Sequence, residues 1–222
     1  MDLMDRLDQL IDERLLLKHP FYTKWAEGTL PIEALQEYAR QYYAFESSFP
    51  RFLSAIHART ENAEVRQQLL DNLWDEEHGR DNHAELWLRF AEGIGVARDD
   101  VRGSERNEAT RELVELYGEM SREAAPAEAV AALYAYERQV PQVAQSKIVG
   151  LQRHYGVEDD RATAFFKLHG VLDIEHSQAE REMLGKLAAE ADPGPIEDAT
   201  RRALDAWWNF LSAVDQSVAA AA

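Results

Sequence analysis

The sequence predicts an all-α protein in which about seven helices form one bundle. Apolar residues recur three and four positions apart along most of the 222 residues, and strict alternation of apolar and polar residues appears nowhere. The breaks between the helical stretches are short and contain glycine or proline, which favours helices that pack against their sequence neighbours. We therefore expect a single domain over residues 1–222.

The composition narrows the class of protein. Hydrophobic residues make up 45% and charged residues 29% of the chain, as in soluble globular proteins. A net charge of −17 repels nucleic acid and anionic membranes, so neither is an expected partner. Because the chain has no cysteine, disulfides, iron–sulfur clusters and thiol nucleophiles are excluded. No signal-peptide pattern and no apolar run of about 18 residues occurs, so we expect a cytoplasmic protein.

The N-terminal part of the chain predicts two long helices and a short one. Leucine and isoleucine recur at helical spacing over residues 2–18, which indicates an amphipathic helix. His19-Pro20 interrupts this helix, and a short second piece follows. Residues 28–31 contain a glycine and a proline that end the short piece and begin a helix over 31–60. Pro50 should produce a kink in that helix.

The rest of the chain predicts five further helices. They cover residues 62–92, 108–123, 127–154, 159–191 and 196–218. Glycines end the first of them, and the polar stretch 97–107 that follows indicates a loop with at most a helical turn. The sequence Asp192-Pro-Gly-Pro195 separates the last two helices.

Three residues of metal-binding type share one face of the helix predicted over 159–191. His169, Asp173 and His176 lie four and seven positions apart, within about 40° of one another around a helix. Their face is also the apolar one. It includes Ala162, Phe165, Phe166, Leu172, Met183, Leu184 and Leu187. Burying two imidazoles and a carboxylate is costly unless a metal ion or other buried groups compensate them, and this helix alone leaves both explanations open.

The helix predicted over 62–92 carries a second pair of candidate ligands. Glu76 and His83 lie seven positions apart on its inner face. That face is marked by Leu69, Leu73, Trp87 and Phe90. His78 points to the opposite side, where we expect it to be solvated. Half-buried acids and histidines are common near helix surfaces, so this pair alone is a weak signal.

Two charged residues, Glu137 and Lys147, interrupt the inner apolar stripe of the helix predicted over 127–154. An ion pair between them is excluded, because ten residues of helix hold them about 15 Å apart. Pro141 cannot donate a hydrogen bond to the carbonyl of Glu137, so the helix should bend there. Each charge needs its own explanation, and a metal ion provides one for Glu137.

The candidate metal ligands together are three carboxylates and three imidazoles. They are Glu76, His83, Glu137, His169, Asp173 and His176. Two divalent cations against three carboxylates leave a net charge of about +1, whereas the metal-free cluster would bury about −3. Nitrogen and oxygen ligands without thiolates suit iron or manganese, and open positions beside them would admit dioxygen. The sequence therefore predicts a centre of two iron ions, or of one iron and one manganese ion.

The order and spacing of these ligands resemble those of the heme-oxygenase-like di-metal oxidases. The resemblance is closest to the subfamily of the chlamydial protein associating with death domains, which makes para-aminobenzoate for folate. It covers nearly the whole chain and implies a heme-oxygenase-like bundle, the fold of thiaminase-II and pyrroloquinoline-quinone synthase. Thiaminase-II needs a nucleophilic cysteine, which this chain lacks. The matching strings are Phe21-Tyr22-x-Lys24-Trp25, Tyr38-Ala39-x-x-Tyr42-Tyr43, Leu53-Ser54-Ala55-Ile56-His57, Leu70-Asp71-Asn72-Leu73, Asp75-Glu76-Glu77 and Val130-Ala131-Ala132-Leu133-Tyr134.

By this resemblance, the enzyme consumes its own side chains. Tyr22 matches the tyrosine that supplies the aromatic ring, and Lys147 matches the lysine that supplies the amino group. Tyr136 matches a redox-active neighbour, and dioxygen and a reductant are the implied co-substrates. The alternative for Tyr22 and Tyr136 is ordinary core packing with a hydrogen-bonded hydroxyl.

One position departs from the subfamily pattern. The chlamydial protein has a further tyrosine four residues before the first histidine of the motif, where this chain has Phe165. Phenylalanine cannot carry a phenoxyl radical. A radical relay that uses this position is therefore absent, or it is rerouted through Tyr42 or Tyr43.

Two other functions compete with this reading. A di-metal oxygenase that acts on a diffusible amino acid or fatty acid would keep the metal centre but would have no need of Lys147. A non-enzymatic interaction module would leave six buried candidate ligands without a purpose. The sequence also allows a homodimer.

Overall fold

The computed structural model describes residues 2–189 and 191–219. Within these ranges the chain is all-α, as predicted, with twelve α-helices, one 3-10 helix and no strand. The elements are α1 (Leu3–Glu13), η1 (Leu16–Lys18), α2 (Pro20–Glu27), α3 (Ile32–Glu46), α4 (Phe49–Arg59), α5 (Ala63–Glu77), α6 (His83–Gly93), α7 (Arg98–Arg102), α8 (Glu108–Glu123), α9 (Pro126–Glu137), α10 (Val140–His154), α11 (Asp160–Leu187) and α12 (Pro193–Ala219). In the part of the chain described, we find no helix with the length and hydropathy to cross a bilayer.

The prediction of about seven helices is wrong, because several predicted helices are divided. Prolines cause two of these divisions. In place of one helix over 31–60 the chain forms α3 and α4, with Pro50 in the first turn of α4. Likewise α9 and α10 replace the helix expected over 127–154, with Pro141 in the first turn of α10. In the first turn of a helix the backbone N–H groups have no partner within the helix, so a proline there costs no hydrogen bond. The chain therefore begins a new helix at each of these prolines and does not continue as one kinked helix.

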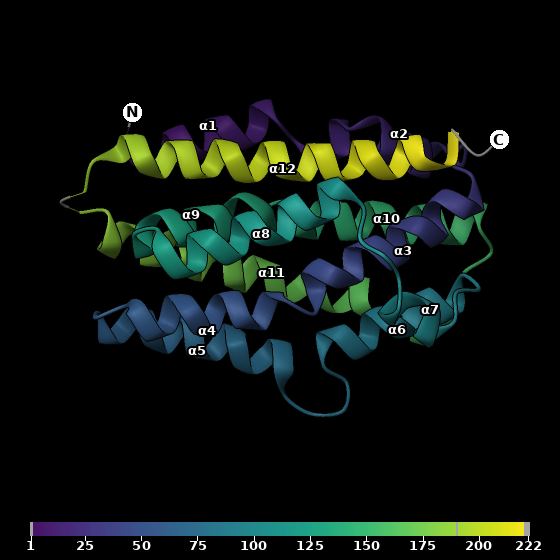
Figure 1. Cartoon of the computed structure of the whole chain (residues 1–222), viewed down its shortest axis with the longest axis horizontal. Coiled ribbons are helices and arrows are strands. Elements are labelled where there is room, and N and C mark those ends of the chain that lie inside the picture. Colours follow the sequence, from purple (N-terminus) through teal and green to yellow (C-terminus); the bar gives the residue numbers. More distant parts are fainter. Residues whose placement is uncertain (1, 190, 220–222) are drawn as a thin grey trace.

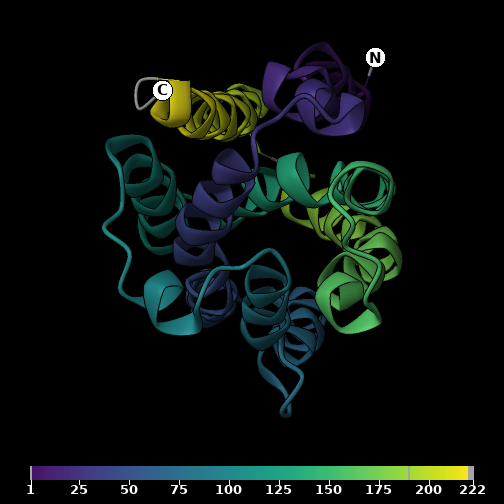
Figure 2. The same cartoon turned by 90° about the vertical axis from the view of Figure 1, so that its right-hand side faces the viewer.

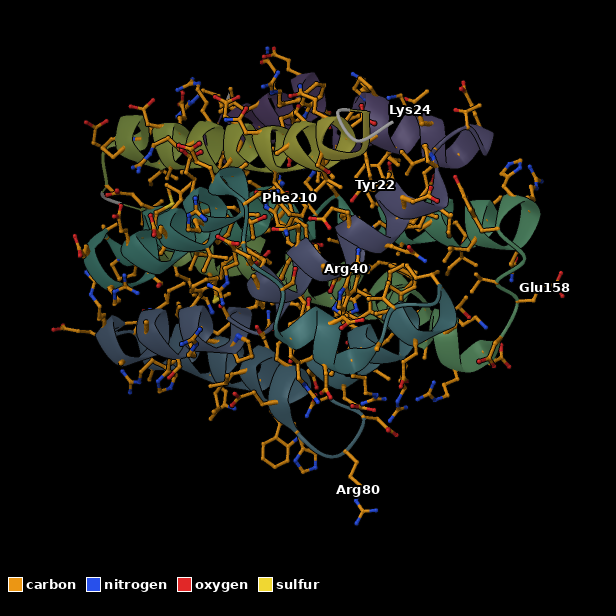
Figure 3. All side chains as sticks on the ribbon, turned by 45° about the vertical axis from the view of Figure 1, so that its right-hand side comes forward. Tyr22, Lys24, Arg40, Arg80, Glu158 and Phe210 are labelled. Carbon is orange, nitrogen blue, oxygen red and sulfur yellow. The ribbon has the colours of Figure 1, made fainter. Side chains whose placement is uncertain are left out.

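A loop divides the helix expected over 62–92 into α5 and α6 (Figure 1). This loop, residues 78–82, contains Gly79 at φ +83°, a backbone conformation that favours glycine. Asn82 then begins α6 as its N-cap, because its side chain accepts a hydrogen bond from a backbone N–H of the first turn. Arg80 projects from the loop into solvent (Figure 3).

The helices pack in layers. The long helix α12 lies along one side of the molecule beside α1 and covers α8 and α9, whereas α4 and α5 form the opposite side (Figures 1 and 2). Between these layers runs α11, which has 28 residues and contacts α5, α6, α9 and α10. Because other helices pack on several sides of α11, the polar side chains on its inner face are shielded from water.

The core is rich in aromatic rings. Its largest fully buried side chains include Trp25, Trp87, Trp207, Tyr38, Tyr42 and Tyr117. Each ring buries roughly 150–250 Å² of surface, so together they contribute much of the stability of the bundle. The tyrosines also carry hydroxyl groups into the core, where each needs a hydrogen-bond partner.

Candidate metal centre

The inner face of α11 carries three predicted ligands. His169, Asp173 and His176 are 6%, 2% and 7% exposed. The Nδ1–H of His169 donates to the carbonyl oxygen of Phe165 at 2.9 Å, one turn earlier. This hydrogen bond fixes the tautomer and leaves the Nε2 lone pair for a cation. Burial, helped by the neighbouring His83, holds the pKa of His169 well below its usual value, so the ring is neutral at neutral pH.

His176 lies between two carboxylates. Its Nε2–H donates to Oδ2 of Asp75 at 3.1 Å, and its Nδ1 lies 3.4 Å from Oδ1 of Asp173. Burial alone would lower the pKa of His176, but Asp173 and Glu137 outweigh burial and raise this pKa to about 10. The side chain of Asp75 is 41% exposed, so Nε2 faces the surface and Nδ1 faces the interior.

Glu76 and His83 meet although they lie on different helices. Glu76 is in the last turn of α5, and His83 is the first residue of α6. Both are buried, with 2.8 Å between Oε2 of Glu76 and Nδ1 of His83. The expectation that one helix face holds both is wrong, but the intervening loop brings the same two side chains together. His78 is exposed, as predicted, and stacks on Trp74 with 3.9 Å between ring centroids.

Glu137 is the last residue of α9 and is 2% exposed. The side-chain amide of Asn72 donates to its two carboxylate oxygens at 3.4 and 3.5 Å. Burial raises the pKa of Glu137 above its usual value. Lys147, the other charged residue on the predicted stripe, donates its hydrogen bond to Tyr38, so the two residues have separate partners as expected.

Glu46 belongs to this site, although the sequence analysis did not select it. It is the last residue of α3 and is 4% exposed. Glu46, His83 and His169 each place a ligand atom within 4.8 Å of the others. Burial and the charge of Glu76 raise the pKa of Glu46 to about 8. The sequence spacing could have indicated that Glu46 is buried, because it lies four residues after Tyr42 on the inner face of its helix.

Glu180 is the second residue that sequence reasoning missed. It lies on α11, four residues after His176, and is fully buried. Burial and the charge of Glu137 hold the pKa of Glu180 well above its usual value. Its position on the same helical face as His176 was the signal that could have found it.

These side chains form what we call the carboxylate–histidine cluster: Glu46, Glu76, His83, Glu137, His169, Asp173, His176 and Glu180. All five buried acidic residues of the described chain belong to it. Several of its buried atoms have no hydrogen-bond partner among the described residues, namely Oε1 of Glu46, Nε2 of His83 and both carboxylate oxygens of Glu180. Each unpaired buried group costs about 1–3 kcal/mol, so the cluster needs compensation. Metal cations fit this need, and carboxylate and imidazole donors suit iron or manganese.

Lys147 belongs to a second buried group, the tyrosine–lysine cluster of Tyr22, Tyr38 and Lys147. The Nζ of Lys147 donates to the hydroxyl of Tyr38 at 2.8 Å, and that hydroxyl lies 3.2 Å from the hydroxyl of Tyr22. Lys147 is 5% exposed, and burial lowers its pKa to about 7 against the opposing charge of Glu46. Its Nζ lies 5.2 Å from the centroid of the Tyr22 ring.

Tyr22 reaches this cluster from α2. Pro20 occupies the first turn of α2, so the residues after His19 continue as a helix and not as an open segment. Tyr22 lies inside the bundle, whereas Lys24 of the same helix lies at the surface (Figure 3) and pairs with Asp215 at 2.8 Å. Burial raises the pKa of Tyr22, so its phenol keeps its proton at neutral pH.

Tyr136 lies in a further aromatic group beside both clusters. Its hydroxyl shares a short hydrogen bond with that of Tyr42, and its ring stacks on Trp207 with 4.2 Å between centroids. Phe165 packs with its ring centroid 4.0 Å from that of His169 and 6.2 Å from that of Tyr42. The phenol of Tyr42 is therefore a neighbour of Phe165.

One enclosed cavity is lined by residues of both clusters. Its walls include Tyr22, Tyr42, Tyr136, Lys147, Phe165 and His169. The cavity volume is about 10 Å³, enough for roughly one water molecule. A benzene-sized ligand needs a cavity of about 150 Å³, so this space holds no free aromatic or fatty substrate as it stands.

The fold and the carboxylate–histidine cluster define the class of protein. A family model described as "iron-containing redox enzyme" matches residues 36–208, and the chain belongs to this family. A domain with a heme oxygenase-like fold from Shewanella denitrificans superposes with a TM-score of 0.83 over 99% of this chain and 94% of that chain, at 17% identity. The predicted heme-oxygenase-like fold is therefore confirmed.

Relatives that are 36–39% identical to this chain share the name 4-aminobenzoate synthase. The chain is 39% identical to the 4-aminobenzoate synthase of Chlamydia pneumoniae over 209 residues, which cover 94% of this chain and 93% of the relative. It is 38% identical to the 4-aminobenzoate synthase of Nitrosomonas europaea over 225 residues, 97% of this chain and 92% of the relative. These similarities confirm the subfamily resemblance that the sequence motifs predict.

Proposed function

We propose that this protein is a dioxygen-dependent para-aminobenzoate synthase that takes the ring from its own Tyr22 and the amino group from Lys147. The observation that carries the proposal is a buried amine held beside a buried tyrosine ring, next to a candidate metal centre and to an enclosed cavity of only about 10 Å³. The names of the relatives support the product.

The carbon skeleton of the product supports a tyrosine source. Para-aminobenzoate consists of a benzene ring and one further carbon, and a tyrosine side chain consists of a benzene ring and Cβ. The product therefore forms when the Cα–Cβ bond breaks, Cβ is oxidised to a carboxyl group and nitrogen replaces the phenolic oxygen. Each change suits a buried ring that cannot diffuse away before the sequence is complete.

Lys147 has the properties of a nitrogen donor. With a pKa of about 7, its amine is neutral in about half of the molecules at neutral pH, and only the neutral form is nucleophilic. Tyr38 accepts a hydrogen bond from Nζ, so it orients the amine without engaging its lone pair. Tyr38 is thus a positioning residue in this proposal.

The metal centre supplies the activation of dioxygen when it is loaded with two iron ions, or with one iron and one manganese ion. The residues that would hold it are Glu76, His83, Glu137, His169, Asp173 and His176, together with Glu46. We assign the hydrogen-bonded pair of Tyr42 and Tyr136 to the exchange of electrons and protons with the Tyr22 site, in place of the phenol that Phe165 lacks.

A di-metal oxygenase acting on a diffusible amino acid or fatty acid is the weaker alternative. It would need a substrate chamber, and the enclosed cavity has a volume of about 10 Å³. This alternative would also give the buried amine of Lys147 no role in the reaction. Both observations favour the self-derived product.

Isotope labelling tests the proposal directly. The chain is prepared with ring-deuterated tyrosine and ¹⁵N-labelled lysine, reconstituted with iron and manganese, and given oxygen and a reductant. We expect para-aminobenzoate that carries both labels, no more than one molecule for each chain, with the change in protein mass located at Tyr22 and Lys147. An unlabelled product, or repeated turnover of an added substrate with both residues intact in the peptide map, would contradict it.

A further inference from the structure

Glu180 has no part in the function proposed above, although it is the most completely buried acidic residue of the carboxylate–histidine cluster, at 0% exposure. It lies four residues after His176 and seven after Asp173, so all three share the inner face of α11. No donor in the described ranges hydrogen-bonds either of its oxygens. A carboxylate in such a place is costly to bury without a cation.

In the described part of the chain, no hydrogen bond joins a cationic side chain to the carboxylate oxygens of Glu180. After burial, the charge of Glu137 has the largest effect on the pKa of Glu180, and the charge of Asp173 raises this pKa as well. The adjacent Arg181 points away from the cluster, because its guanidinium donates to Asp8 at 2.7 Å. Among the described residues, the side chains with the largest electrostatic effect on Glu180 are therefore the acids Glu137 and Asp173.

The candidate ligands divide between two positions. Three of them surround one point, with ligand atoms within 4.8 Å of one another: Glu46, His83 and His169. Glu76, Glu137, Asp173 and His176 remain, and the last three of these are available to a second ion. Iron and manganese take up to about six ligands, so this second position has room for another carboxylate. Glu180 lies at this end of the cluster, because its neighbours are Glu137 and Asp173.

We propose that Glu180 is a metal ligand that binds the same ion as Glu137. The inference rests on the metal-binding part of the proposed function and not on its product. Ligation accounts for the complete burial of Glu180, for the absence of a hydrogen-bond partner among the described residues and for the nearby charge of a second carboxylate. A purely structural Glu180, by contrast, would need only a hydrogen bond to Glu137.

Glu180→Gln separates these two roles. Glutamine has nearly the same size, and its amide can donate to Glu137, but it lacks the anionic oxygen that a metal ion binds. Metal-free protein is titrated with Mn²⁺ alone, and free Mn²⁺ is counted by electron paramagnetic resonance. We expect two bound ions in the wild type, and in E180Q one ion of unchanged affinity and a second bound at least about tenfold more weakly. Glu182→Gln removes an exposed acid from the same helix and should bind as the wild type does.

Binding of both ions by E180Q with wild-type affinity would overturn the proposal. Glu180→Asp keeps a carboxylate on a shorter side chain and should bind the second ion more tightly than E180Q; equal binding by these two variants would also overturn it. Circular dichroism checks that each variant keeps its helical content. The product assay is separate: a wild-type chain that binds two ions but yields no para-aminobenzoate contradicts the proposed function and leaves Glu180 as a ligand.

Discussion

The carboxylate–histidine cluster and the tyrosine–lysine cluster lie side by side in one core, but their polar atoms are satisfied in different ways. In the first, buried atoms of Glu46, His83 and Glu180 have no hydrogen-bond partner among the described residues. In the second, Lys147 and its tyrosines hydrogen-bond one another. On the proposed function, metal cations from solution complete the first cluster, whereas the second is complete with protein alone. This difference means that each can be perturbed without the other.

The largest expected effect comes from Lys147→Arg, which changes only the tyrosine–lysine cluster. A guanidinium stays protonated and cannot supply an amino group, so we expect product to fall at least about 100-fold while both metal positions remain filled. Mass spectrometry of the product and elemental analysis of the protein measure the two quantities. Lys167→Arg, at a surface lysine that pairs with Asp160, is the matched control and should form product normally. Product at wild-type level from K147R would exclude Lys147 as the nitrogen source.

The converse test is His176→Ala, which changes only the carboxylate–histidine cluster. Loss of an imidazole should weaken one metal position at least about tenfold and abolish oxygen consumption. Metal content and an oxygen electrode measure both effects. His78→Ala removes an exposed histidine and should change neither. Full metal content in H176A would remove His176 from the site.

The pH dependence of product formation isolates the amine. Because burial lowers the pKa of Lys147 to about 7, the nucleophilic form predominates above this pH and disappears below it. We therefore expect the single-turnover rate to rise with pH through about 7, and to fall about tenfold for each unit below it. Metal content, measured in the same samples, should stay constant between pH 6.5 and 8, a range of roughly one unit around that pKa. A rate that does not vary over this range would show that protonation of the amine does not limit the reaction.

The smallest expected effect is on thermal stability. Metal ions that bind only the folded chain should raise its melting temperature, by roughly 5–10 °C at about 100 times the dissociation constant. Differential scanning fluorimetry with and without a chelator measures this shift. K147R should show the same shift as the wild type, because it leaves the ligands in place. A melting temperature that chelation leaves unchanged would mean that the buried acids do not depend on cations.

The sequence predicts the location of a site residue well where helix geometry alone determines the direction of its side chain. His169, Asp173 and His176 lie within one unbroken helix, so their spacing determines that they share a face. The breaks before Pro50 and Pro141 were harder to foresee, because a proline within a helical pattern is compatible with a kink or with a new helix.

Residues that depend on packing between distant segments escape such reasoning. Glu46 lies at the end of α3, where an acidic residue is common. Only its position beside His83 of α6 and His169 of α11 identifies it as a candidate ligand. Glu180 could be a surface residue at a similar helical position if α9 did not cover it. The link between Lys147 and Tyr38 joins α10 to α3, and no spacing in the sequence encodes it.

The packing of the Tyr22 ring also bears on what happens to the protein afterwards. The ring lies 5.4 Å from that of Phe21, 6.3 Å from that of Trp25 and 6.4 Å from that of Tyr38, measured between centroids. On the proposed function, a chain that has reacted loses this ring, and removal of a buried aromatic side chain costs about 3–5 kcal/mol of folding free energy. Such a loss is a large share of the stability of a typical domain, so spent chains become the preferred substrates of cellular proteases. The supply of product would then follow the rate at which new chains are translated, and the folded state itself would distinguish chains that have reacted from those that have not.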